Sequence, residues 1–118
     1  MTNPKKGQIE VELGGETYKC RLTIDSLIKI ENECGQSIIQ LAQKMSQADV
    51  KIFDLSTILR YALRGGGNDV QHKEVFKIIE DAGIIKVAGA VANLITATLN
   101  DPNQEAEAQG KEQAVATK

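Results

Sequence analysis

Two short runs of alternating apolar and polar residues flank Gly14-Gly15, and they constrain the fold of this chain more than any other feature. A period of two is typical of β-strands with one buried face and one face in water. Paired glycines supply the positive φ angles that a two-residue hairpin turn needs. A turn centred on these glycines predicts the pairs Leu13–Glu16, Val11–Tyr18, Ile9–Cys20 and Glu10–Lys19, with Glu12 near Arg21. The apolar side chains then share one face, which must pack on helices because an isolated hairpin is marginally stable.

The second run continues to Ile24, and helical spacing of apolar residues follows it. Five helical segments are expected between there and residue 99. Their candidate N-terminal caps are Thr23 or Asp25, Ser37, Asp54 and Asp69, and their candidate stops are Gly35 and Gly83. The sequence therefore predicts an α+β fold, with an N-terminal β-hairpin packed on a bundle of about five helices.

Two of these segments allow more than one structural interpretation. Residues 49–53 alternate in character, so a brief third strand before Asp54 is an option. The last segment, residues 84–99, is apolar around most of its circumference, which indicates either a central core helix or a helix pressed against a partner. In the second case the candidate partner face consists of Val87, Val91, Leu94 and Ile95.

The length of 118 residues suits one domain, expected over residues 7–99. Residues 1–6 are expected to form a flexible lead. Residues 100–118 are polar and cannot bury enough apolar surface to offset their ordering entropy, so they are expected to form a disordered tail. The net charge of −2, without clustered basic residues, argues against duplex nucleic acid. No apolar segment reaches the roughly 20 residues of a membrane span, and no apolar signal region opens the chain, so a soluble cytoplasmic protein is expected.

Residues that could carry chemistry do not assemble into a recognisable site. Cys20 and Cys34 lack metal spacing and are expected to be buried, reduced thiols. His72 is the single histidine, expected in the first turn of a helix and in solvent. The run Gly65-Gly66-Gly67 lacks the Lys-Ser/Thr of a phosphate loop and is expected to be a flexible connection. We therefore expect no catalytic, cofactor-binding or metal-binding residue.

Four basic residues around the glycine run, Arg60, Arg64, Lys73 and Lys77, have helical spacing. They could form a basic patch for an acidic partner. Ordinary solvated helix faces explain the same spacing and are the preferred interpretation.

Residues 7–38 resemble the start of the phage tail protein family found in gene transfer agents and siphophage-type prophages. The motif that carries the resemblance is Leu13, Gly14, Gly15, Glu16, Thr17 and Tyr18, followed by Leu22, Thr23, Glu31 and Gly35. The resemblance continues more loosely to about residue 99. It implies a non-enzymatic tail assembly chaperone that binds the tape measure protein or other tail proteins in the bacterial cytoplasm, with homo-oligomers an option. The alternative is a structural tail component, such as a tube or connector protein, that stays in the virion.

Overall fold

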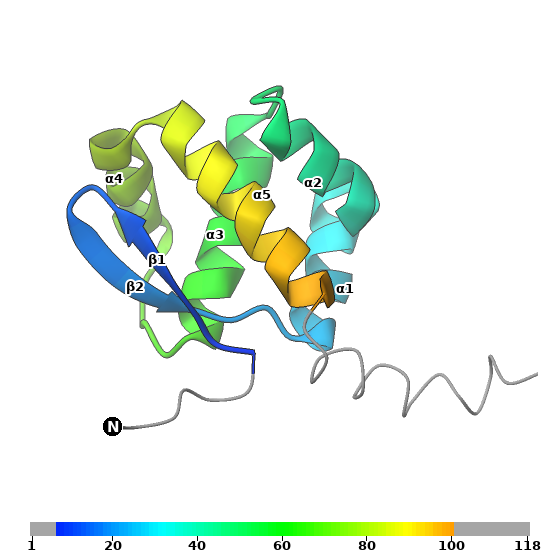
Figure 1. The fold of residues 1–118 in the computed structure, drawn as a ribbon, viewed down its shortest axis with the longest axis horizontal. Coiled ribbons are helices and arrows are strands. Elements are labelled where there is room, and N and C mark those ends of the chain that lie inside the picture. Colours follow the sequence, from blue (N-terminus) through cyan, green and yellow to red (C-terminus); the bar gives the residue numbers. More distant parts are fainter. Residues whose placement is uncertain (1–6, 101–118) are drawn as a thin grey trace, which may run out of the picture.

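The computed structural model describes residues 7–100 and consists of one β-hairpin followed by five α-helices (Figure 1). The strands are β1 (Ile9–Leu13) and β2 (Glu16–Cys20). The helices are α1 (Ile24–Cys34), α2 (Ile38–Ser46), α3 (Ile52–Gly65), α4 (His72–Ala82) and α5 (Ile84–Asn100). The predicted α+β fold is confirmed. The expected lead 1–6 and the expected tail from residue 101 onward lie outside the described residues, and Asn100 is the last residue of α5.

The hairpin has the predicted register. Leu13 pairs with Glu16, Val11 with Tyr18, Ile9 with Cys20, and Glu10 with Lys19. One detail of the prediction is wrong: Glu12 pairs with Thr17, and Arg21 lies beyond the end of β2. In an antiparallel pair the partner of each residue is fixed by the turn, so a turn at Gly14-Gly15 places Thr17 opposite Glu12.

Helix α5 lies at the centre of the fold and packs against α2, α3, α4 and β1 (Figure 1). The four residues predicted as a candidate partner face, Val87, Val91, Leu94 and Ile95, expose 0 to 2% of their surface. The other interpretation of this helix, a central core helix, describes the structure. In this conformation the four side chains are covered by the chain's own elements, because α5 has neighbours on most of its circumference.

Capping residues define where the first helices begin and end. The Thr23 hydroxyl accepts a hydrogen bond from the Ser26 backbone N–H, so Thr23 and not Asp25 caps α1. Ser37 caps α2 in a capping box with Gln40. Gly35 ends α1 in the left-handed conformation, as its position in the sequence predicts. The helical spacing of Leu27, Ile28 and Ile30 predicts an inward face for α1, but Ile28 is 51% exposed.

The starts of α3 and α4 differ from the predictions based on aspartate. Lys51 precedes α3, so Asp54 lies inside the first turn, and residues 49–53 form no third strand. Gln71 precedes α4, and its N–H donates to the Glu74 carboxylate, whereas Asp69 lies before the helix. A carboxylate is favourable anywhere in the first turn, because the helix dipole is positive there. An aspartate therefore marks the start of a helix only to within a few residues.

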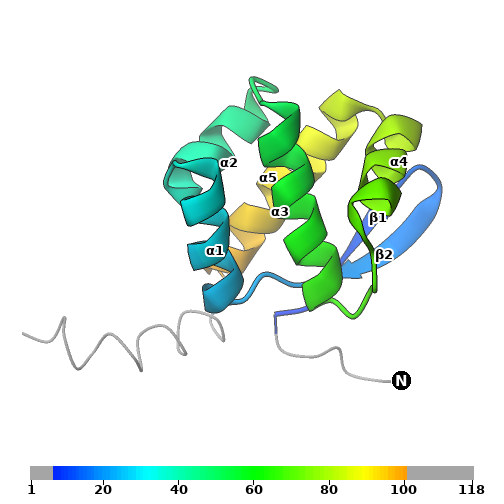
Figure 2. The same cartoon turned by 180° about the vertical axis from the view of Figure 1, so that it is seen from behind.

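The glycines at the end of α3 pack closely on the backbone at the end of β2 (Figure 2). A Cβ on Gly65 would lie 2.2 Å from the Arg21 carbonyl oxygen, and one on Gly66 would lie 1.9 Å from the Lys19 carbonyl oxygen. The Arg21 N–H donates to the Ala62 carbonyl at 2.9 Å, and the Asn68 amide donates to the Lys19 carbonyl at 2.7 Å. The prediction of a flexible connection is wrong for Gly65 and Gly66, which are needed for close backbone contact.

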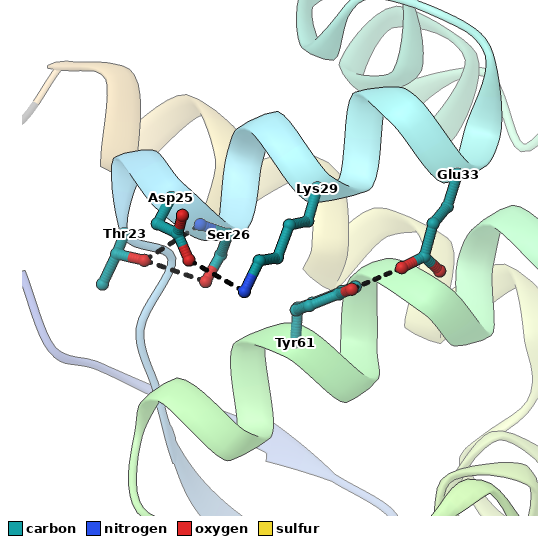
Figure 3. Close-up of polar contacts among 6 residues, drawn as sticks. All are labelled: Thr23, Asp25, Ser26, Lys29, Glu33 and Tyr61. Carbon is teal, nitrogen blue, oxygen red and sulfur yellow. Dashed lines mark hydrogen bonds and ion pairs between the residues drawn. The ribbon is translucent and has the colours of Figure 1, made fainter.

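Polar contacts join α1 to α3 on the opposite side of the molecule from β1 (Figures 2 and 3). The Tyr61 hydroxyl of α3 donates to the Glu33 carboxylate of α1. This hydrogen bond is the first cause, before burial, of the raised pKa of Tyr61. Lys29 and Asp25 form an ion pair of 3.0 Å one helical turn apart on α1. Both contacts are largely exposed, and the ion pair lies within α1, so each contributes little to stability.

Candidate protein-binding surface

The two phenylalanines of this chain lie on the surface of the protein. Phe53 is 57% exposed and Phe76 is 50% exposed, whereas the buried core is built from aliphatic side chains. Phenylalanine is among the residues most often found inside proteins, and large exposed apolar groups that cluster mark interaction sites. The exposure of Phe53 and Phe76 therefore points to a candidate interaction site around them.

Phe76 lines a shallow groove where α3 begins, α4 ends and α5 begins, at the upper part of Figure 1. The groove has a volume of about 350 Å³ and is lined by Ile52, Phe76, Ile79, Glu80 and Ile84. Ile79 is nearly buried, while Ile52 and Ile84 are 48% and 43% exposed. Phe53 and Ile85, each next in the chain to a residue of the groove, are 57% and 75% exposed. We call the five lining residues the apolar groove.

The local sequence explains why these side chains remain uncovered. In α4 the buried stripe is Val75 and Ile79, and Phe76 projects from a neighbouring direction on the helix. Gly83 ends α4, and α5 leaves at an angle of 110°, so Ile84 starts a new helix beside Phe76. Ile52 joins them because α3 begins three residues earlier than an N-cap at Asp54 would place it. The sequence analysis missed this site, although a phenylalanine outside the apolar stripe of its helix was a usable signal.

The motif residues of the hairpin have a structural role in this fold. Gly14 and Gly15 take φ values of 60° and 85°, as the two-residue turn requires. A Cβ on Gly14 would lie 3.6 Å from the Asp81 Cβ, so the turn packs on the end of α4. Leu13 is buried, Tyr18 is half-buried, and Glu16 and Thr17 are exposed. None of these residues lines the apolar groove.

Residues with reactive side chains do not form a catalytic or metal centre in the described part of the chain. Burial raises the pKa of the Cys20 thiol from its ordinary value of 9.0 to about 11. Burial, followed by the charge of Asp54, raises the pKa of Cys34 to about 12. Both thiols are therefore protonated and weakly nucleophilic at neutral pH. Among residues 7–100 no three potential metal ligands gather, and His72 is exposed at the start of α4.

A polar hollow of about 420 Å³ lies between α1 and α3 and contains part of the predicted basic patch. Arg60 and Arg64 line it together with Lys29, Asp25 and Tyr61. The other two members of the predicted patch lie on α4, where Lys77 forms an ion pair of 3.2 Å with Asp81. Neither of them lines the hollow, so it does not unite the four cations.

Comparison with known protein families gives a match that covers every described residue of the chain. Residues 6–101 match the family described as "Phage tail tube protein, GTA-gp10", a family of phage tail assembly chaperones. The chain belongs to this family. Neither a search of curated proteins nor a search of solved structures gave a significant match.

Membership of this tail assembly chaperone family confirms the resemblance seen in the sequence, both at the hairpin and in its looser continuation to the end of α5. The family implies interaction with other tail proteins. Within residues 7–100, no single helix is long and apolar enough to cross a bilayer, and α4 and α5 meet that test only as a pair bent by 110°. The site to be explained is therefore a surface for binding protein.

Proposed function

We propose that this chain is a tail assembly chaperone that binds the tape measure protein during tail assembly, in the cytoplasm of the bacterial host. The observation that supports this proposal is the apolar groove, with Phe76 half-exposed at its side and Phe53 exposed nearby. A long, apolar, helical partner aggregates unless its apolar faces are covered. A small protein that presents an exposed groove between helices can cover one such face.

The shape of the apolar groove suits an amphipathic helix. Helices dock in grooves through apolar residues at positions i, i+3 or i+4, and i+7, which form one stripe. Ile52, Phe76 and Ile84 come from three different helices and surround the hollow on several sides. Glu80 is the one charged residue that lines the groove, so a cation at the edge of the partner's stripe would be favoured there.

Co-expression of the tape measure protein with this chain tests the proposal directly. The native chain should keep the tape measure protein in the soluble fraction. Phe76→Glu, which places a charge in the apolar groove, should return it to the pellet. Ile39→Glu is the matched control, since Ile39 is 53% exposed on α2 and does not line the groove. The proposal fails if the tape measure protein aggregates equally with and without the native chain.

A structural tail component is the second candidate function, favoured by the description of the family as a tail tube protein. A structural subunit stays in the finished particle at regular stoichiometry, whereas a chaperone leaves before assembly is complete. Mass spectrometry of purified particles separates the two functions. Sedimentation of the purified chain, native and Phe76→Glu, tests in addition whether the apolar groove joins copies of this chain.

A further inference from the structure

The outer edge of β1 carries backbone groups that no other described residue uses. With a two-residue turn at Gly14-Gly15, the residues that exchange hydrogen bonds across the hairpin are Leu13, Val11 and Ile9. The N–H and C=O groups of Glu10 and Glu12 therefore point away from β2. Among residues 7–100 neither residue takes part in a backbone hydrogen bond outside the hairpin. This row of donors and acceptors is what an added strand requires.

The other edge of the sheet is blocked at the end of β2. The Lys19 carbonyl accepts from the Asn68 amide, the Arg21 N–H donates to Ala62, and Gly65 and Gly66 pack directly on this part of the backbone. The sheet has two strands, in the order β1-β2, so in the described structure β1 provides the edge that is open along its whole length.

A groove runs beside the free edge and provides room for the side chains of a third strand. It has a volume of about 320 Å³ and lies between β1 and the outer face of α5. On the α5 side it is lined by Ala90, Asn93, Leu94 and Ala97, of which three are small or short. Front and rear views place β1 and α5 side by side, in agreement with their packing (Figures 1 and 2). An extended segment could bond to β1 and rest small apolar side chains on α5.

The negative charge on β1 indicates which kind of strand could pair with its outer edge. Glu10 and Glu12 lie on the solvent face of β1, so an added strand would place its own solvent-facing residues beside two carboxylates. A second copy of this chain, paired edge to edge through β1, would bring glutamates against glutamates, which is destabilising. A strand with Lys or Arg on that face and small apolar residues on the other would be favoured.

We propose that the outer edge of β1 binds an extended segment of a partner protein, in which basic residues alternate with small apolar residues. Main-chain hydrogen bonds to Glu10 and Glu12 hold the segment, and the two carboxylates and the α5 groove select its side chains. This surface is separate from the apolar groove, and binding here does not depend on the proposed chaperone function.

A short acetylated and amidated peptide of alternating lysine and valine is the probe, titrated against the full chain by NMR and calorimetry. We expect the largest shifts at the amides of Glu10, Glu12 and the α5 groove residues. Glu12→Pro removes the outward N–H and leaves the hairpin bonds in place, because its donor does not face β2. Glu12→Thr is the matched control, with the same loss of charge and an intact N–H. Affinity should be about tenfold lower for the proline variant than for the threonine variant.

Two further measurements keep the test decisive if the proline variant does not fold. A peptide N-methylated at its lysines, whose N–H groups would face β1 opposite Glu10 and Glu12, cannot donate to β1 and should not bind the native chain. The double variant Glu10→Lys with Glu12→Lys should prefer a peptide of alternating glutamate and valine. Phe76→Glu should bind the lysine peptide as the native chain does, which separates this surface from the apolar groove. Absence of binding at millimolar peptide, equal binding of the N-methylated peptide, or shifts confined to the apolar groove would overturn the proposal.

Discussion

Replacing Phe76 with alanine should weaken binding of the tape measure protein by about 30-fold. A phenylalanine side chain offers roughly 200 Å² of surface, and Phe76 leaves 50% of its surface exposed. A partner that covers this half removes about 100 Å² from water, which is worth about 2.5 kcal/mol at about 25 cal/mol per Å². The Cβ of the alanine keeps part of this contact with the partner. The expected loss of binding free energy is therefore about 2 kcal/mol, or roughly 30-fold in the dissociation constant.

The affinity is measured by calorimetry or interferometry with a soluble fragment of the tape measure protein. Because the other half of Phe76 is packed against the fold, urea unfolding must show that the variant is still folded at the assay temperature. Ile39→Ala is the control, because this side chain is similarly exposed on α2 but does not line the apolar groove. The reasoning is refuted if Phe76→Ala binds as tightly as the native chain, or if Ile39→Ala weakens binding to the same extent.

Three further predictions concern the fold. In urea unfolding, Gly65→Ala should destabilise the protein by about 3 kcal/mol, because its Cβ would lie 2.2 Å from the Arg21 carbonyl oxygen. Gly89→Ala in α5 is the control: its Cβ would meet nothing within 4 Å, so this variant should be slightly more stable than the native chain. Thr23→Ala should cost about 1 kcal/mol of stability by the same assay through loss of the α1 cap, and an unchanged midpoint would contradict that role. The raised pKa of Cys20 means that the folded state keeps a proton that the unfolded state loses above pH 9.0, so stability should fall as the pH rises from 9.0 toward about 11. The slope attributable to this thiol, up to about 1.4 kcal/mol per pH unit, should disappear in Cys20→Ala.

The hairpin could be predicted in detail because its determinants are local. The alternation of Val11 and Leu13 with charged residues, and the paired glycines, agree on one register, and the structure has that register. The error at Glu12 was one of counting along the strand, since the same turn places Thr17 opposite it. The start of α1 could also be predicted, because the Thr23 hydroxyl accepts its capping hydrogen bond from Ser26, only three residues later.

Apart from the off-stripe Phe76, the candidate binding surface could not be predicted, because it depends on how separate helices meet. Helical periodicity indicates which residues face inward, but not which of the others remain uncovered. Ile28 was expected inside and is exposed, whereas Val87 was a candidate partner residue and is buried. The apolar groove forms only where the starts of α3 and α5 come beside α4, an arrangement set by tertiary packing. The prediction of a flexible loop at Gly65 failed for the same reason, since Gly65 contacts Arg21, just after β2 and more than forty residues earlier in the chain.

The close packing of Gly65 and Gly66 on β2 has a consequence for how this protein can aggregate. A sheet with two free edges can add strands at both and so propagate into a fibre, whereas a sheet with one blocked edge is monovalent. Any strand that pairs with β1 would complete a three-stranded sheet and contribute its own outer edge to the complex. Further growth would then depend on the partner and not on this chain. Close packing of these two glycines would thus prevent a sheet from growing in both directions from this chain.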